Sequence, residues 1–513
     1  MKARRNESSK KPRCGGAVAA WLLVPLLVLV LLKTDCLLQV TPRLDCERVR
    51  QGQQLVDVAK LKDADPTPKT PDSATEAPRS HALSDEIAGH SIDAIKDLKH
   101  EKDSLAMKAA IDGSLRSSGN VAAPRSKLSC NFSSKRMNTC AMEGDVRMHG
   151  KSGSFYVVAV SDDSYRPENG TVVIRPYPRK WEKWSMLTVR EVTIHSGAAA
   201  AAPPRCTVRH DVPVVVFSTG AYSRNFFHSM TDIVIPLFNT AREYDGQVQL
   251  VATDYKHKWI TQFRHILAAL SVYPVIDFDA DETVRCFPSA RVGVEGHAEL
   301  RIIPALSRKG YTMTDFRDFL RSAYSLKRAW TTPANRSSGG QRPRLVMVLR
   351  RKSRSLTNEA EAIATATEVG FEVVAAGPEM VANMAEFAEV VSSCDVMVGV
   401  HGAGLTNMVF LPNNGTVMQI IPWGGLRWNC FTELGLPVPE MGIRYVEYEA
   451  TAEETTLKDV YPRDHVVFTD PLAIHKKGFD PVYEIFLEGQ NVTLDIDRFR
   501  GAMQQIYQSV TIA

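Results

Sequence analysis

The hydrophobic positions of the chain fall into three regions, and the first is a single long apolar run. Residues 15–32 read GGAVAAWLLVPLLVLVLL, which as an α-helix would extend about 27 Å and could cross a thin bilayer. Six Lys and Arg residues and one Glu precede it, so the positive-inside rule places residues 1–14 in the cytosol. A cleaved signal peptide is the alternative, but the run ends in LLKTDC without a small-residue cleavage pattern. We therefore expect an uncleaved anchor.

The second region, residues 33–127, contains no Phe, Trp or Tyr and is rich in Lys, Asp, Ser, Ala and Pro. Such a segment cannot bury enough apolar surface to offset the entropy lost on ordering. We expect a disordered stem that holds a folded part away from the membrane. Residues 85–111 have the pattern of a solvated helix within it.

In the third region, between residues 206 and 474, short apolar runs alternate with helical stretches, which is typical of parallel α/β layers. Strands are predicted at residues 212–217, 247–253, 344–350, 371–377, 396–400 and 416–422, and helices at residues 225–242, 259–270, 358–369 and 384–393. The stretch PANRSSGGQRP (residues 333–343) is a predicted linker. Two Rossmann-like units in tandem would place a ligand cleft at the carboxyl edges of their strands.

Composition adds few constraints. The 513 residues are 44% hydrophobic, and 62 Lys and Arg against 58 Asp and Glu give a net charge of +4. This balance does not supply the basic field of a nucleic-acid binder, so nucleic acid is excluded as a partner. Five N-x-S/T triplets fit a lumenal chain that carries N-linked glycans: Asn131, Asn169, Asn335, Asn414 and Asn491.

The cysteines also fit an oxidising compartment. Of nine in the chain, six lie in the expected folded part: Cys130, Cys140, Cys206, Cys286, Cys394 and Cys430. No C-x-x-C pair and no Cys/His set occurs among them, so structural zinc is not expected. Cys130 with Cys140 is the favoured disulfide because it closes a short loop; the other four cysteines stay unassigned.

Two patterns suggest chemistry on separate units. His228 and Asp232 are four residues apart on a predicted helix and would share one face, close enough to act on one hydroxyl. A half-buried structural His–Asp pair is the alternative. In the second unit, Arg350 and Arg354 follow a strand and precede a helix, which suits a diphosphate, and a solvated basic turn is the alternative there.

A third pattern joins an apolar strand to a turn of small residues, His401-Gly402-Ala403-Gly404, with a helix expected near Leu405. Small residues let backbone amides approach a ligand, but a βα turn with a purely structural role would have the same sequence pattern.

Together these segments resemble glycosyltransferase family 61 over about residues 130–513. The matching blocks are CNFSSKRMNTCAMEGDVR, VVIRPYPRKWE, FSTGAYSRNFFHSMTDIVIPLF, the RRKSR…TNEAE segment and VGVHGAGLTNMVFLP. They look most like the plant branch that acts on xylan, with arabinofuranosyl and xylosyl transferases. Ser229 departs from the acid that plant members often carry after the His, which puts the rate or the acceptor choice in question.

The resemblance implies a GT-B fold, inversion and no obligatory metal. The alternative, a GT-A fold, needs a D-x-D pair of metal ligands. The sequence DFDAD (residues 277–281) contains this pattern. We interpret it as an acidic loop.

The combined hypothesis is an inverting, metal-independent glycosyltransferase of the Golgi membrane, with a single-pass type II topology and a lumenal catalytic part. It moves a pentose from UDP-arabinofuranose or UDP-xylose onto xylan, with Asp232 as the base, oriented by His228 or exchanging roles with it. The expected donor-binding residues are Arg350, Arg354, His401, Gly402, Ala403, Gly404 and Asn407.

The expected parts are a cytosolic tail (1–14), an anchor (15–32), a lumenal stem (33–127), an N-terminal Rossmann-like acceptor domain with a leading β region (128–335), a C-terminal Rossmann-like nucleotide-sugar domain (336–474) and a helical tail (475–513). Complexes with other Golgi enzymes stay open. Transfer of xylose to N-glycans or of N-acetylglucosamine to protein stays open as well, and so does a catalytically silent lumenal binding subunit.

Overall fold

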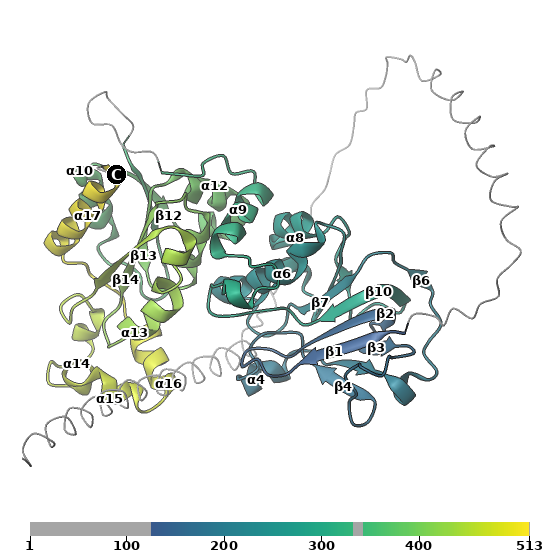
Figure 1. Ribbon diagram of the computed structural model, residues 1–513. Helices are drawn as coiled ribbons and strands as arrows, with labels where there is room; N and C mark the ends of the chain where they lie inside the picture. The colour runs from purple at the N-terminus through teal and green to yellow at the C-terminus, as the bar shows by residue number, and fades with distance from the viewer. Residues whose placement is uncertain (1–124, 332–341, 512–513) are drawn as a thin grey trace, which may run out of the picture. The chain divides into compact units, whose positions relative to one another are not determined.

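The folded part is a mixed α/β structure with two β-sheets and helices packed on them (Figure 1). A computed structural model describes residues 125–331 and 342–511, and from Ser126 onward these belong to one compact unit. Several predicted features lie outside the described residues: the cytosolic tail (1–14), the anchor (15–32), nearly all of the stem (33–127) and Asn335. Within the ranges that are described, no helix combines the length and the apolar character needed to cross a membrane.

The first sheet has ten strands. They are β1 (Lys127–Asn131), β2 (Thr139–His149), β3 (Ser154–Val157), β4 (Thr171–Ile174), β5 (Val192–His195), β6 (Val208–Arg209), β7 (Val214–Ser218), β8 (Gln249–Thr253), β9 (Ile276–Asp277) and β10 (Val284–Val292). The main order is β4-β5-β3-β2-β10-β7-β8-β9, with β1 beside β2 and β6 beside β10. β10, β7, β8 and β9 run parallel, whereas β1, β2 and β3 are joined by antiparallel pairing.

The second sheet has five strands, all parallel, in the order β12-β11-β13-β14-β15. They are β11 (Arg344–Val348), β12 (Glu372–Ala376), β13 (Val396–Val400), β14 (Thr416–Ile421) and β15 (Arg444–Glu449). Every residue of β13 and β14 is buried, as expected for central parallel strands covered on both faces. The strands expected from apolar runs are confirmed. β15 was not predicted, because its sequence RYVEYE is largely polar.

The helices predicted at residues 225–242, 259–270, 358–369 and 384–393 form, the first two in several pieces, and helices that the sequence did not predict form as well. On the first sheet the helices are α4 (Lys183–Leu187), α5 (Phe226–His228), the π-helix η2 (Ser229–Val234), α6 (Ile235–Ala241), α7 (His257–Gln262), α8 (Arg264–Leu270) and α9 (Met313–Ala323). With the second sheet lie α10 (Glu359–Val369), α11 (Pro378–Ala382), α12 (Met384–Ser393), the 3-10 helix η6 (Ala403–Phe410), α13 (Arg427–Cys430), the π-helix η7 (Phe431–Gly435), α14 (Val466–Thr469), α15 (Pro471–His475), α16 (Phe479–Val482), the π-helix η10 (Tyr483–Glu488) and α17 (Ile496–Thr511). The helix predicted near Leu405 is therefore a 3-10 helix.

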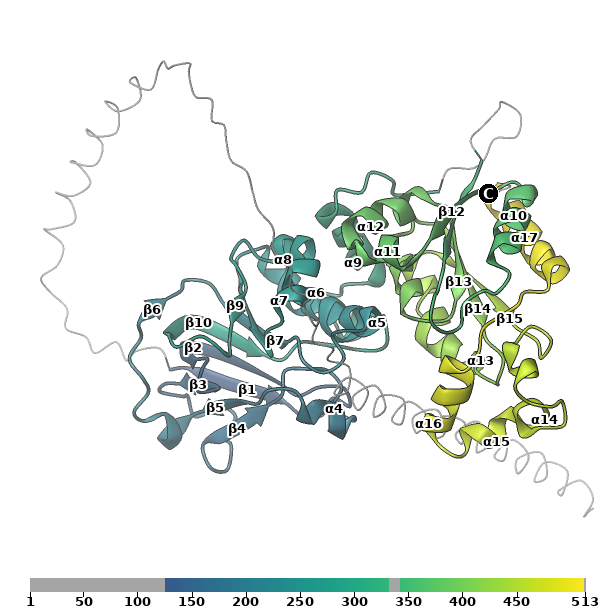
Figure 2. The ribbon, with the colours of Figure 1, turned by 180° about the vertical axis from the view of Figure 1, so that it is seen from behind.

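The two faces of the second sheet are covered by different helices (Figure 2). Side chains of α10 and α17 pack with one set of strand residues, including Leu345 and Val398, in one hydrophobic cluster. Side chains of α12 and η6 pack with the alternate residues, including Val346 and Met397, in a cluster that continues into the helices of the first sheet. The two sheets are thus linked through one hydrophobic core.

A buried arginine adds polar links across this junction. Arg317 on α9 donates to the backbone carbonyls of Val409, Leu411 and Met441. Burial lowers the pKa of its guanidinium to about 9. These bonds attach α9 to the segment that follows the predicted small-residue turn.

Two disulfides brace the first sheet. Cys130 and Cys140, the pairing favoured from the sequence, face each other across β1 and β2 and are bonded. The second bond joins Cys206 to Cys286 across a sequence separation of 80 residues. Of the described cysteines, Cys394 and Cys430 are buried and carry no disulfide.

Candidate active site

A pocket of about 170 Å³ is lined by residues that follow strands of both sheets. The first sheet and its loops supply Arg179, Asn225, Phe227, His228 and Glu299. The second sheet and the helices after it supply Arg354, His401, Gly402, Ala403, Glu433, Leu434, Tyr483 and Leu487. The predicted His228 is thereby brought to one cavity with four of the predicted donor-binding residues.

On the first side, the helix that follows β7 positions a histidine and an aspartate. Its start is fixed by Asn225, whose side chain accepts from the backbone N–H of Phe227. His228 Nδ1 lies 3.0 Å from Oδ2 of Asp232, across the boundary between α5 and η2. A carboxylate only accepts hydrogen bonds, so Nδ1 carries the hydrogen and Nε2 of the neutral ring keeps a lone pair.

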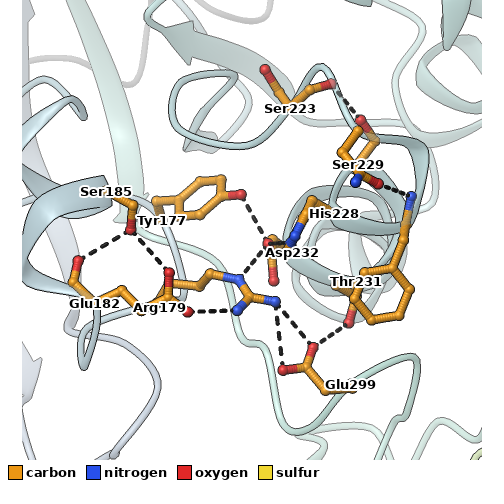
Figure 3. Close-up of polar contacts among 12 residues, drawn as sticks. Tyr177, Arg179, Glu182, Ser185, Ser223, His228, Ser229, Thr231, Asp232 and Glu299 are labelled. Carbon is orange, nitrogen blue, oxygen red and sulfur yellow. Dashed lines mark hydrogen bonds and ion pairs between the residues drawn. The ribbon is translucent and has the colours of Figure 1, made fainter. Parts of the chain in front are cut away.

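Asp232 itself is fully buried and does not line the pocket. Its Oδ2 accepts from Arg179 Nε at 2.7 Å and from the Tyr177 hydroxyl at 2.9 Å (Figure 3). Burial by itself raises the pKa of Asp232, but Arg179 and His228 outweigh that effect and the net pKa lies below its usual value. Its Oδ1 has no hydrogen-bond partner among the described residues and lies 3.7 Å from Arg136 Nη2. This geometry does not suit the predicted role of base for Asp232, because the carboxylate is fully buried and does not line the pocket.

Arg179 is the centre of the charged network around this aspartate. Its guanidinium also donates to Glu182 at 2.7 Å and to Glu299 at 3.3 Å (Figure 3). Burial lowers its pKa, but Asp232, Glu299 and Glu182 outweigh that effect and raise it well above the usual value. Tyr177 and Arg179 lie in the sequence block VVIRPYPRKWE, from which no role was predicted for them. Their partners are distant in sequence, so no local pattern reveals the network.

Ser229 points away from the pocket into the protein. Its hydroxyl donates to the carbonyl of Ser223 at 2.7 Å and accepts from Trp259 Nε1 at 3.0 Å. The side chain is 2% exposed. In this structure the residue after His228 therefore contacts core groups, and the departure noted in the sequence does not alter the pocket wall.

On the second side, Arg354 lines the pocket, is half-buried and has a left-handed backbone, φ 54°. Its Nε has no hydrogen-bond partner among the described residues, and Nη1 donates to the His401 carbonyl at 3.3 Å. Burial lowers the pKa of its guanidinium. A buried donor that lacks a partner, in a strained conformation at a cavity, is a feature that points to a ligand.

The remaining predicted donor-binding residues lie behind the pocket surface. Arg350 donates from Nε to the Ser353 carbonyl at 2.8 Å, and burial lowers its pKa to about 9, with Arg354 adding to the effect. Asn407 donates to the Gly404 carbonyl at 2.9 Å, inside η6. Arg350, Gly404 and Asn407 are not among the lining residues.

His401 lines the pocket at the end of β13. Its Nδ1 lies 2.9 Å from Gln419 Nε2 and its Nε2 lies 3.7 Å from Glu433 Oε2. Burial, with Arg354 and Arg350 adding to it, puts its pKa well below the usual value, so the ring is neutral. Glu433 and Tyr483 were missed from the sequence. They lie on η7 and η10, in short irregular helices that no periodicity predicts.

The carboxylates of the predicted acidic loop (residues 277–281) contact other groups of the protein. Asp277 accepts from the backbone of Asp279, Asp279 pairs with Arg190, and Asp281 pairs with Arg285 at 2.7 Å. A second cluster with metal-ligand spacing consists of Asp145 and two cysteines that form a disulfide, so its sulfurs are not thiolate ligands. The loop carboxylates are thus engaged by the backbone and by arginines, and the two sulfurs of the second cluster are bonded to each other.

The predicted glycosylation sites differ in exposure. Asn131 and Asn169 are exposed. Asn414 and Asn491 are half-buried, and their amide oxygens accept from Arg444 and Ser355, respectively.

Comparison with known proteins assigns the chain to a family. The family model described as Glycosyltransferase 61 matches residues 226–418. An alpha-1,3-arabinosyltransferase of Oryza sativa subsp. japonica is 43% identical over 375 residues, which are 73% of this chain and 64% of that protein. A beta-1,2-xylosyltransferase of the same organism is 41% identical over 392 residues, 74% of this chain and 84% of that protein. A xylan glycosyltransferase of Arabidopsis thaliana is 32% identical over 76% of this chain and 82% of that protein.

The chain spans 64% of the length of the two rice arabinosyltransferases that it matches. The xylosyltransferase and the xylan glycosyltransferase are covered over most of their length, and the family match contains His228, Asp232, Arg354 and His401. The protein therefore belongs to glycosyltransferase family 61, in the plant branch with the arabinosyl-, xylosyl- and xylan glycosyltransferases.

Proposed function

We propose that this protein transfers a pentose from UDP-arabinofuranose or UDP-xylose to a xylan acceptor, with inversion, in a GT-B arrangement of its two α/β halves. The observation that supports this most directly is the shared pocket, where His228 from one half lies in the same cavity as Arg354 and His401 from the other. The names of the plant relatives supply the sugar and acceptor classes.

In the proposed reaction, His228 is the catalytic base. Asp232 holds the hydrogen on Nδ1, so Nε2 accepts the proton of an acceptor hydroxyl while its oxygen bonds to the anomeric carbon. The bond from that carbon to the UDP oxygen breaks and leaves its electron pair on UDP. The sequence favours Asp232 as the base, oriented by His228 or exchanging roles with it. Here His228 takes the base role, because His228 lines the pocket and Asp232 does not.

The donor diphosphate is assigned to the second half. Arg354 offers a positive charge whose buried Nε has no partner among the described residues, and the small residues Gly402 and Ala403 lie beside it in the pocket lining. Positive charge fixed in the protein stabilises the charge that develops on the leaving diphosphate. This supply of counter-charge is the basis for proposing a metal-independent reaction.

The cellular setting is proposed from the sequence. The apolar run at residues 15–32 would anchor the chain in the Golgi membrane as a single-pass type II protein, with the catalytic part in the lumen. Two disulfides and the exposed glycosylation triplets at Asn131 and Asn169 suit that compartment.

The test is a donor and acceptor screen with the purified full chain in detergent. We expect UDP release from UDP-arabinofuranose or UDP-xylose only when xylan oligosaccharides are present, and a glycosidic bond of inverted anomeric configuration in the product. Transfer of another sugar, or transfer only to N-glycan or protein acceptors, would contradict the proposed substrates. Binding of UDP without any transfer would favour the silent binding subunit.

A further inference from the structure

Gln419 is a fully buried polar residue in the middle of β14, a central strand of the second sheet. It is paired in register with Gly399 of β13, two residues before His401. A buried amide destabilises the fold unless both its N–H₂ and its oxygen have partners. The partners of Gln419 therefore determine how its side chain is oriented.

The contacts around the amide allow one orientation. Gln419 Nε2 lies 3.3 Å from the backbone carbonyl of Cys430, which only accepts, and the Tyr445 hydroxyl lies 3.0 Å from Oε1. The flipped amide would bring two oxygens together at Cys430. Nε2 is thus the donor at both of its contacts, and the second contact is His401 Nδ1 at 2.9 Å.

This donor determines the tautomer of His401. Because Gln419 donates to Nδ1, that nitrogen carries the lone pair and the hydrogen of the neutral ring is on Nε2. The charged groups that act on the ring are Arg350 and Arg354 from the segment after β11, and Glu433 from η7 lies 3.7 Å from Nε2. A second proton on Nδ1 would face the N–H₂ of Gln419 and would add a positive charge near two guanidinium groups. The ring is therefore held neutral.

We propose that Gln419 is a positioning residue that fixes His401 as a neutral imidazole with its hydrogen on Nε2, and that this N–H donates to an oxygen of the departing UDP diphosphate. The inference rests on the proposed function and extends it to a residue outside the pocket. His401 keeps its proton throughout. The electron pair of the broken C–O bond stays on the UDP oxygen, which the N–H and Arg354 stabilise.

The most discriminating variant is Gln419→Glu. Its affinity for UDP is measured by calorimetry on the full chain. A carboxylate accepts from Nδ1–H and raises the pKa of His401. Below that raised pKa the ring carries both hydrogens and still donates from Nε2; above it, the single hydrogen moves to Nδ1 and Nε2 presents a lone pair to the phosphate. The variant should bind UDP about as well as wild type at low pH and about 10-fold more weakly at high pH. Dividing the UDP affinity of the variant by that of wild type at each pH cancels the effect of UDP's own titration.

Two further variants isolate the cause. Gln419→Met removes the fixed donor without adding charge, so a smaller loss that is independent of pH is expected. In the double variant Gln419→Glu with His401→Asn, no imidazole remains, and the pH dependence should disappear. A flat ratio for Gln419→Glu, or a pH dependence that persists in the double variant, would overturn the inference.

A measurement on the wild-type ring covers the case in which Gln419→Glu does not fold. With ring-¹⁵N-labelled histidine in the full chain, the His401 signals, assigned by their loss in His401→Asn, should show an unprotonated Nδ1 between about pH 5 and pH 8. A protonated Nδ1 would refute the tautomer. If wild type fails to bind UDP at all, the proposed donor site fails; if it binds UDP and the ring is in the other tautomer, only the role of Gln419 fails.

Discussion

At the scale of single residues, burial separates the roles of two groups that are hydrogen-bonded to each other. His228 is 8% exposed and lines the pocket, whereas Asp232 is 0% exposed and is enclosed by Arg179, Tyr177 and His228. A base must reach the hydroxyl that it deprotonates, within hydrogen-bonding distance or through one water. The aspartate meets a different requirement: it holds the imidazole in one tautomer and orientation.

We therefore predict that His228→Asn lowers turnover by about 10²- to 10⁴-fold, the usual contribution of a general base. Asp232→Asn should lower turnover less, because the Asn oxygen can still accept from His228 Nδ1. Turnover at saturating UDP-sugar measures both effects, and unchanged UDP affinity with a native circular dichroism spectrum is the control. A larger loss in Asp232→Asn than in His228→Asn would return the base to Asp232.

At the scale of elements, the turn between β13 and η6 depends on one glycine. Gly402 has φ 148°, and a Cβ at this position would lie 2.2 Å from Arg350 Nη1. The backbone of the turn therefore lies directly against the guanidinium of Arg350. Any side chain would strain the backbone and displace the guanidinium.

Gly402→Ala should raise the UDP-sugar concentration needed for half-maximal rate by about 10-fold, since backbone strain of about 1–3 kcal/mol is added at the donor site. Dependence on the acceptor should change little. Gly197→Ala is the matched control, because Gly197 also has a positive φ of 58° but no neighbour within 4 Å of the added Cβ. Steady-state kinetics with each substrate varied in turn provide the measurement. Equal effects from the two substitutions would show that displacement of Arg350 is irrelevant.

At the scale of the whole molecule, the groups proposed for catalysis come from two sheets joined by one core. The first sheet presents His228 and the second presents Arg354 and His401 to the same pocket. Neither half contains all of the proposed site. In the proposed reaction, positive charge from the second half takes the place of a metal ion. The acidic residues at 277–281 are paired with other groups of the first half.

Transfer activity of the full chain should accordingly survive an excess of EDTA. In a metal-dependent enzyme, chelation removes the main counter-charge to the leaving group. The rate of UDP release with and without EDTA, followed by added Mn²⁺, is the measurement. Loss of activity that Mn²⁺ restores would contradict the assignment to Arg354 and make Asp277, Asp279 and Asp281 the residues to mutate.

The sequence by itself determined the α/β class and the positions of β7, β8 and four of the five strands of the second sheet. Runs such as VMVGV predict buried parallel strands because strands covered on both faces are apolar along nearly their whole length, and TVMQII fits this pattern apart from Thr416 and Gln419. It also placed His228 beside Asp232, since residues four apart share a helix face. Local patterns suffice for such features because they depend on neighbours along the chain.

Only the tertiary structure decided which of these residues face the pocket. Tyr177 and Arg179 contact Asp232 from 55 and 53 residues away in sequence, and Glu299 joins this network through Arg179, which is 120 residues away. Gln419 meets His401 across two strands, and Tyr483 enters the pocket from a region interpreted as a helical tail. Burial and hydrogen-bond direction assign the roles, and both depend on packing between segments whose separation along the chain no local pattern encodes.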